Sequence, residues 1–393
     1  MRALSLFVRA TLLWCLALSL PSCIDPYMPD AISSDKSYLV VDGFINSNGV
    51  TTINLSRTYD IQSGAAPPKE GRATVYIEEE NGTRNQLRES SPGTYTSNNL
   101  RLNTAKRYRL YISTAGKVYT SDFTAVKVTP PIDDITWRAV NTGLNIYVNS
   151  HDDTNLTQYY RWEYEETWEI VTPYNPGIEY KNGVIQDITV DYPLICWGTS
   201  RSVDIKVSNT VRLSRDVVSN YLLHSYPTTS ERLRGTYSML VKQYAQTADE
   251  YQYWDLLKKN TENIGTLFDP LPAQLTGNVR CVDDASELAL GYVGVHSVEV
   301  KRLFIRNSEL PRTWPIKSGY EGCTPPDTVF IVGPDIRVPP AQILQSAFGG
   351  PNYLPIGPHF DPTSGLLIGY TAKNRDCIDC RTRGTAIKPS FWP

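Results

Sequence analysis

The chain has 393 residues, and this length suggests two or three domains. It carries 38 basic and 41 acidic side chains, a net charge of −3, so there is no basic surplus and we expect no nucleic-acid partner. The four histidines show no ligand-like spacing, and we expect neither a metal nor a cofactor. They are His151, His224, His296 and His359.

The first residues have the features of a secretory signal. Arg2 and Arg9 give a basic start without acids, and the apolar run 10–20 is too short to span a bilayer, which takes about 20 residues. Leu20-Pro21-Ser22-Cys23 resembles the lipobox of bacterial lipoproteins, in which the cysteine receives a diacylglyceryl group. The sequence therefore predicts a signal peptide at 1–22 and a lipid anchor on Cys23.

The mature chain is expected to be tethered at one end. Residues 1–22 hold two of the basic residues and no acid, so cleavage leaves a net charge of −5. Residues 23–36 are polar and contain prolines, which is typical of a tether. No second apolar stretch of membrane length follows.

Short alternating strands dominate the next segment. Tyr38-Leu39-Val40-Val41 and Thr51-Thr52-Ile53-Asn54-Leu55 are examples, and Asn81-Gly82 is the preferred pair for a tight hairpin turn. About seven such strands at regular spacing predict an immunoglobulin-like β-sandwich over 37–128.

Thr129-Pro130-Pro131 marks a boundary, and alternation resumes beyond it. Tyr160-Arg161-Trp162-Glu163-Tyr164 places three rings on one strand face and charges on the other. We interpret 131–309 as a second β-rich domain, similar to fibronectin type III.

One helix is expected within this domain, over 248–263. Thr247 and Glu250 form a capping box, in which each side chain bonds the other residue's backbone amide. Aromatic and leucine side chains follow at helical spacing, and Gly265 is a plausible stop. The helix should bury its aromatic side.

From 310 to 393 the chain is rich in Pro and Gly and poor in periodicity. The predicted fold class is therefore mainly β: two sandwiches, one notable helix and an irregular, disulfide-stapled C-terminal tail. Five cysteines remain after the signal and the lipidated residue, so one thiol should be free or the pairing partial. The disulfide candidates are Cys196, Cys281, Cys323, Cys377 and Cys380.

We expect Cys323 to pair with Cys377 or Cys380, and Cys196 with Cys281 as the next pair. Cys377-Ile-Asp-Cys380 could also be a redox pair or half of a zinc site. A redox motif needs a strand before it and a helix after it, and zinc needs two more ligands. A structural staple is favoured.

The acidic stretch Glu163, Glu165, Glu166 and Glu169 could supply a carboxylate pair for glycoside hydrolysis. Glu163, Glu165 and Glu169 would share one strand face, and a solvated face is the simpler interpretation. The 25 Tyr and 8 Trp could form platforms for sugars, although rings in strands are usually core. No hydrolase, metalloprotease, P-loop or dinucleotide motif is present, so we expect no enzyme and no catalytic residues.

Several motifs in fixed order resemble one family. They are Leu39-Val-Val-Asp-Gly43, Cys196-Trp197, Tyr251-Gln-Tyr-Trp254, Asn260-Thr-Glu-Asn-Ile-Gly265, Phe268-Asp-Pro-Leu-Pro272, Gly277-Asn278, Gly291-Tyr292, Lys301-Arg-Leu-Phe-Ile305, Cys377-Ile-Asp-Cys-Arg381 and Lys388-Pro-Ser-Phe-Trp392. The set resembles an uncharacterised surface-lipoprotein family of Bacteroidota, called domain of unknown function 4249, over nearly all of the mature chain. One departure is Gly384-Thr385, where two glycines are expected, and it puts the local turn in doubt.

The resemblance implies a lipoprotein of the outer membrane, exposed at the cell surface, that serves a TonB-dependent transporter in nutrient capture. It carries over no catalytic residue, because the family has none assigned. We therefore expect a non-enzymatic accessory protein. The alternative is a surface glycan-binding protein or glycoside hydrolase. The sequence names neither the ligand nor the partner.

Overall fold

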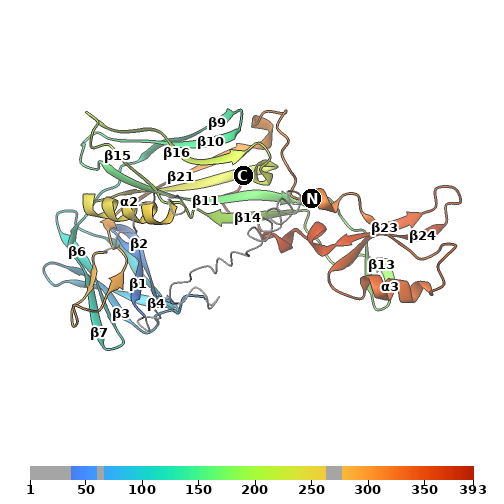
Figure 1. Ribbon diagram of the computed structural model, residues 1–393, viewed down its shortest axis with the longest axis horizontal. Coiled ribbons are helices and arrows are strands. Elements are labelled where there is room, and N and C mark those ends of the chain that lie inside the picture. The colour runs from blue at the N-terminus through green and yellow to red at the C-terminus, as the bar shows by residue number, and fades with distance from the viewer. Residues whose placement is uncertain (1–36, 60–65, 263–276) are drawn as a thin grey trace, which may run out of the picture. The chain divides into compact units, whose positions relative to one another are not determined.

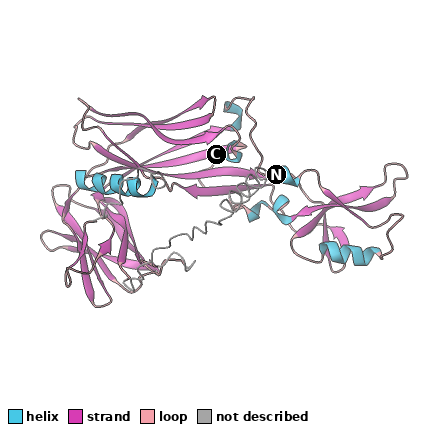
Figure 2. Cartoon of the chain, in the orientation of Figure 1, coloured by secondary structure: helices cyan, strands magenta, loops and turns pink. Residues whose placement is uncertain are grey.

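The computed structural model describes residues 37–59, 66–262 and 277–393, and strands dominate it (Figure 2). The expected signal peptide, Cys23, the tether up to residue 36 and the Gly265 stop lie outside these residues. Within the described ranges, no helix has the length and apolar character that crossing a membrane requires.

The first unit is a β-sandwich whose hydrogen-bonded strand order is β18-β7-β6-β3-β4-β5-β2-β1-β19. Its N-terminal strands are β1 (Leu39–Asn46), β2 (Asn48–Arg57), β3 (Thr74–Glu79), β4 (Arg84–Ser91), β5 (Thr94–Arg101), β6 (Arg107–Thr114), β7 (Lys117–Ser121) and β8 (Thr124–Ala125). Alternate side chains point into one core, where Leu39, Ile53, Ile77 and Leu110 are fully buried. The sequence expectation of a sandwich built from short strands is confirmed.

Three strands from much later in the chain complete this sandwich. They are β18 (Val279–Cys281), β19 (Ala289–Leu290) and β20 (Val295–His296). β18 pairs with β7, β19 and β20 run parallel to β1, and Val279, Val293 and Val295 lie in the first core. The expected assignment of all of 131–309 to the second domain is wrong here, because alternation predicts a strand and not the sheet that receives it.

The second unit packs a three-stranded sheet on a five-stranded one. The strands of the three-stranded sheet follow the order β16 (Asp216–Pro227), β10 (Gly143–Asp152), β9 (Ile132–Val140). The strands of the five-stranded sheet follow the order β14 (Ile195–Arg201), β11 (Tyr159–Val171), β17 (Thr236–Ala245), β21 (Val298–Arg306). The fifth strand of this sheet, β15 (Lys206–Asn209), also pairs with β11. Tyr160, Trp162 and Tyr164 are buried between the sheets, so these rings belong to the core and form no exposed platform.

Helix α2 (Ala248–Glu262), yellow in Figure 1, begins close to the expected residue. The Thr247 hydroxyl accepts the amide of Glu250 at 3.2 Å, which is half of the expected capping box. The Glu250 carboxylate instead lies 3.4 Å from Nε2 of His296 in β20 and is the buried residue of this helix. The aromatic side is only half-buried, and His296 stacks on Phe44 of β1 at 4.4 Å, so α2 meets the first sandwich through its Glu250.

The segment after 310 is more regular than expected. It contains α3 (Pro340–Phe348) and a sheet of order β22 (Asp327–Phe330), β24 (Leu367–Asn374), β23 (Tyr353–Phe360). A hairpin from the second domain joins it, β12 (Ile178–Lys181) and β13 (Val184–Asp187), and Tyr180 hydrogen-bonds Gln345 of α3 at 2.7 Å. We call these elements the C-terminal lobe. Pro355 and Pro358 lie in β23 and interrupt the alternation that would have revealed it.

Short 3₁₀ segments complete the described elements. They are Glu231–Leu233, Asn307–Glu309, Glu321–Cys323, Arg375–Cys377 and Cys380–Thr382.

Two disulfides hold the C-terminal segment. Cys323 pairs with Cys377, which confirms one of the two expected partners, and Cys196 pairs with Cys380. The expected Cys196–Cys281 pair is wrong, because Cys281 lies in the first sandwich as a buried free thiol. Cys377 and Cys380 belong to different disulfides, so they form neither a mutual redox pair nor half of a zinc site.

The turn at Gly384-Thr385 tolerates its departure from the family pattern. Thr385 forms a two-way backbone bridge with Trp197, with N···O distances of 2.8 and 3.0 Å. A Cβ at Gly384 would lie 2.6 Å from the Trp197 carbonyl oxygen, so a glycine is needed there. Only the first of the two expected glycines is sterically required.

Candidate functional site

The four candidate glutamates lie along β11, on both faces of the five-stranded sheet. Glu163, Glu165 and Glu169 share the outer face, as predicted, while Glu166 is 3% exposed on the inner one. Glu166 forms an ion pair with Arg232 and accepts a hydrogen bond from the Tyr237 hydroxyl at 2.9 Å. Burial and the nearby Glu166 carboxylate raise the pKa of Tyr237, so this hydroxyl stays a proton donor.

The outer-face glutamates are also partnered. Glu163 forms an ion pair with Arg161 and accepts from the Tyr244 hydroxyl at 2.8 Å. Although burial opposes it, the neighbouring Arg161 guanidinium helps hold the pKa of Glu163 below its usual range. Glu169 accepts the amide of Thr236 at 2.8 Å and the indole N–H of Trp392 at 3.1 Å.

Glu165 is held by two cations. Nζ of Lys242 lies 2.7 Å from its carboxylate and Nε of Arg201 lies 3.7 Å away. None of the four glutamates has the isolated apolar surroundings that keep a general acid protonated, so the arrangement does not resemble an acid and base pair.

A groove of about 490 Å³ lies on this outer face. Strand register places its floor: Glu165 is opposite Arg201 of β14, and Thr167 is opposite Thr199. Arg302 of β21 is opposite Leu240 of β17, and Leu240 is in turn opposite Glu165. One row across the sheet therefore contains Arg201, Glu165, Leu240 and Arg302. We call this hollow the outer-face groove; its lining is Glu165, Glu166, Thr167, Thr199, Ser200, Arg201, Arg302, Pro389 and Phe391.

The outer face is covered at both ends and open between them. At one end Arg161 stacks under Trp254 of α2, with the guanidinium carbon 4.4 Å from the ring centroid. At the other end Trp392 packs edge-on against Phe304 at 5.7 Å and Trp197 at 6.4 Å. The C-terminal segment thus crosses the sheet and brings Phe391 to the groove, with 40% of that side chain exposed.

Arg302 is the half-buried cation of the groove. Its Nη1 donates to the Ser238 hydroxyl at 3.0 Å, and its guanidinium carbon lies 3.5 Å from the Phe391 ring centroid. Burial lowers the pKa of Arg302, and the Glu165 carboxylate opposes this effect. Within the described residues no carboxylate comes within 4.0 Å of it.

A second hollow of about 470 Å³ lies in the C-terminal lobe. Tyr180, Tyr192 and Phe348 line it, together with Arg375. Arg375 is already bonded to Asp379 at 3.0 Å, and the Glu179 carboxylate accepts hydrogen bonds from Gln186 and Thr189 and lies 3.9 Å from Lys181. Its charged groups are therefore satisfied internally, which distinguishes it from the outer-face groove.

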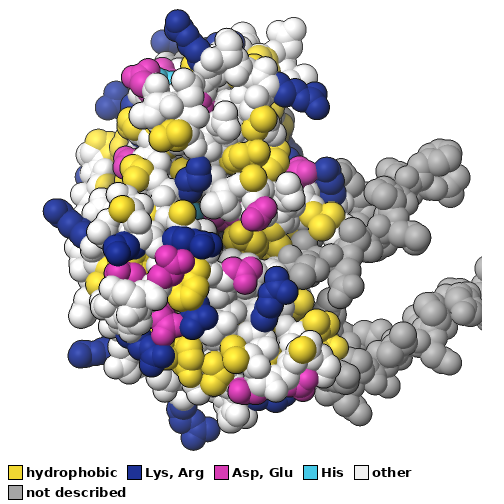
Figure 3. Space-filling model, turned by 90° about the vertical axis from the view of Figure 1, so that its left-hand side faces the viewer, with side chains coloured by type: hydrophobic (Ala, Val, Ile, Leu, Met, Phe, Trp, Pro, Cys, Tyr) yellow, Lys and Arg dark blue, Asp and Glu magenta, His cyan; other side chains and the backbone are white. Residues whose placement is uncertain are grey.

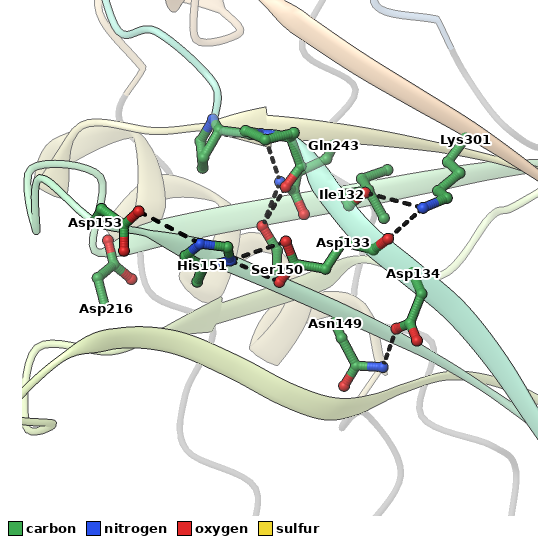
Figure 4. A network of polar contacts seen from close by, with 12 residues as sticks. Ile132, Asp133, Asp134, Asn149, Ser150, His151, Asp153, Asp216, Gln243 and Lys301 are labelled. Carbon is green, nitrogen blue, oxygen red and sulfur yellow. Dashed lines mark hydrogen bonds and ion pairs between the residues drawn. The ribbon is translucent and has the colours of Figure 1, made fainter.

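A polar network connects the two sheets of the second unit (Figure 4). Gln243 is fully buried; its Nε2 donates to the Ser150 hydroxyl and to the Pro130 carbonyl, both at 2.8 Å. At the rim, His151 lies 2.8 Å from Asp133, and this hydrogen bond raises the pKa of His151. Among the described residues, no cluster of His, Cys, Asp or Glu is arranged to hold a metal ion.

Charges are mixed on the visible surface. On the face drawn in Figure 3, Lys and Arg are interspersed with Asp, Glu and hydrophobic side chains, and no large patch of one sign is formed.

Sequence reasoning selected the glutamates of β11 and missed Arg201, Arg302 and Phe391. The signal was weak: Lys301-Arg302 stand side by side in an alternating strand, and Phe391 lies near the end of the printed chain. No local pattern links three segments that only sheet register and the C-terminal crossing bring together.

The fold defines a mainly β protein of two sandwiches with a disulfide-held C-terminal lobe. The sequence matches a family over residues 24–302, and the chain belongs to that family, described as domain of unknown function (DUF4249). No curated protein matches the sequence.

Two solved structures are weakly similar. One is a DUF4785 family protein from Legionella pneumophila, 10% identical, with 52% of this chain and 51% of that chain covered and a TM-score of 0.18. The other is the BSP domain of a biofilm-associated protein, 10% identical, with 69% and 59% covered and a TM-score of 0.13. The chain thus spans between half and three fifths of these proteins, and likeness at this level carries no functional meaning.

Proposed function

We propose that the protein is a non-enzymatic lipoprotein of the outer membrane, anchored through Cys23 and exposed at the cell surface. There it acts as an accessory to a TonB-dependent transporter in nutrient capture. The observation that carries the proposal is the pair of disulfides, Cys196–Cys380 and Cys323–Cys377. Such bonds persist in oxidising compartments, which is where the lipobox-like Leu20-Pro21-Ser22-Cys23 would deliver the chain.

The chemistry of β11 supports a binding role over catalysis. Each candidate glutamate already has a cation, hydroxyl or N–H partner. The outer-face groove can hold a ligand, and the sandwiches offer surface for a protein partner, which needs on the order of 1,000 Å² for a stable complex.

A surface glycan-binding protein is the second candidate. The observation in its favour is that the partly exposed ring of Phe391 and the outer-face residue Thr199 line one groove. A ring with neighbouring hydrogen-bonding groups suits sugars.

Purification of the native lipoprotein in mild detergent tests the first candidate. We expect a transporter to be recovered in about one-to-one ratio, as a stable interface of standard size requires. The matched control is Cys23→Ala, which should lose fatty-acid label and recover little transporter. Native protein that carries lipid but brings down no transporter would contradict the accessory role.

A further inference from the structure

The outer-face groove has a surplus of positive charge. Arg201 and Arg302 line it, and Lys242 pairs with Glu165, the groove carboxylate on the outer face. The buried Glu166 carboxylate and its partner Arg232 lie on the inner side of the sheet. Three cations therefore face one carboxylate, a surplus of two positive charges. The adjoining Arg161–Glu163 pair is neutral and leaves the surplus of two charges unchanged.

Arg302 and Arg201 carry this surplus. Arg302 is bonded to the neutral Ser238 hydroxyl and the Phe391 ring. Arg201 is only 3.7 Å from Glu165, whose shorter contact is with Lys242, and its side chain is 85% exposed. A half-buried guanidinium without a carboxylate is suited to bind one, because its donors match both carboxylate oxygens.

The remaining lining indicates what bears the carboxylate. Thr199, opposite Thr167 on the outer face, can present a hydroxyl to the groove, and Phe391 brings a partly exposed ring to it. A hydroxyl and a ring beside an anion-binding centre suit a saccharide unit, and about 490 Å³ is in the usual range for a small-ligand site.

We propose that the outer-face groove binds a saccharide that carries a carboxylate, with Arg302 as its anchor and Arg201 as a second contact. The carboxylate would lie between the two guanidinium groups, and the sugar ring against Phe391 and Thr199. This names the cargo class of the proposed nutrient capture and rests on that function, although binding itself needs no transporter.

Calorimetric titration of the purified lipoprotein in mild detergent tests the site. The probes are a panel of oligouronides and sialyl-oligosaccharides, each beside its methyl ester, which keeps the sugar and removes the charge. We expect at least one acid to bind and its ester to bind at least about tenfold more weakly, as a lost charged hydrogen bond implies. Binding should weaken as salt rises.

Two variants locate the site. Arg302→Met should weaken binding by about 10- to 100-fold, and Arg201→Gln by less, because that side chain is mostly solvated. Arg306→Met is the matched control: Arg306 lies two alternations further along the same face of β21, outside the groove, and its removal should leave binding unchanged. Unfolding midpoints confirm that each variant is folded, and the exposed position of Arg201 keeps the test valid if Arg302→Met is unstable.

Three results would overturn the proposal. They are a failure to bind any acidic saccharide, equal affinity for an acid and its ester, and a loss of affinity in Arg302→Met no greater than that in Arg306→Met. An acidic peptide that binds as tightly, with the same dependence on Arg302, would overturn the saccharide assignment. Transporter recovery distinguishes the two proposals. A folded Arg302→Met protein that still recovers transporter but binds no sugar would support the saccharide site in the groove. Sugar binding by a protein that recovers no transporter would contradict only the accessory role.

Discussion

Replacing Cys196 and Cys380 together by alanine should lower the free energy of unfolding of the C-terminal lobe by about 2–5 kcal/mol. The bond links positions 184 residues apart and ties the C-terminal segment to β14. Without it the unfolded chain gains the freedom of a long open loop. Trp197 follows Cys196 in β14, and its ring centroid lies 6.4 Å from that of Trp392, so tryptophan fluorescence can report the loss of the bond.

Urea unfolding followed by tryptophan fluorescence, with limited proteolysis of 310–393, measures this effect. The double replacement is compared with Cys281→Ala, which removes a cysteine that forms no disulfide and lies in the first sandwich. The double variant should expose 310–393 to protease at lower urea, whereas Cys281→Ala should leave that segment protected. Equal protection in the double variant and the native protein would show that the bond is not the staple.

Replacing Gln243 by methionine should cost about 3–5 kcal/mol. The buried amide accepts the indole N–H of Trp162 at 2.8 Å and donates to Ser150 and Pro130. Methionine, at nearly unchanged volume, leaves the Trp162 N–H and the Pro130 carbonyl without this partner, while the Ser150 hydroxyl keeps only its bond to the Pro131 carbonyl. Gln252→Met, on the exposed side of α2, changes the same atoms in water and should cost almost nothing.

The measurement is the urea midpoint of the second unit. A Gln243→Met loss within about 0.5 kcal/mol of that for Gln252→Met would mean that the network of Figure 4 does not stabilise the packed sheets.

Much of the fold was predictable because its signals are local. The alternation of apolar and polar residues predicted the strands around Leu39 and Tyr160. The capping residue Thr247, followed by apolar side chains at helical spacing, predicted where α2 begins. Thr129-Pro130-Pro131 lies between β8 and β9, where the chain leaves the first sandwich.

The long-range pairings could not be read in this way. Val279 and Val295 alternate like residues of any strand, and only tertiary packing sends them back to the first core. The sequence offered four possible cysteine partners for Cys196, and only the folded chain brings Cys380 within bonding distance of it.

The candidate site shows the same limit. Sequence placed the glutamates of β11 on the correct faces, yet it could not show that Lys242 and Arg232, from other segments, neutralise them. Arg302 differs from the other arginines only through what surrounds it after folding.

Intact-mass spectrometry of the protein purified from native membranes, alkylated without reduction, tests the central claim of an exported, lipid-anchored and disulfide-held chain. The account predicts a polypeptide that begins at Cys23 with diacylglyceryl mass, carries one alkyl group, on Cys281, and lacks the four hydrogens of its two disulfides. A chain that begins elsewhere, an unmodified Cys23, or alkyl groups on Cys196, Cys323, Cys377 and Cys380 would contradict it.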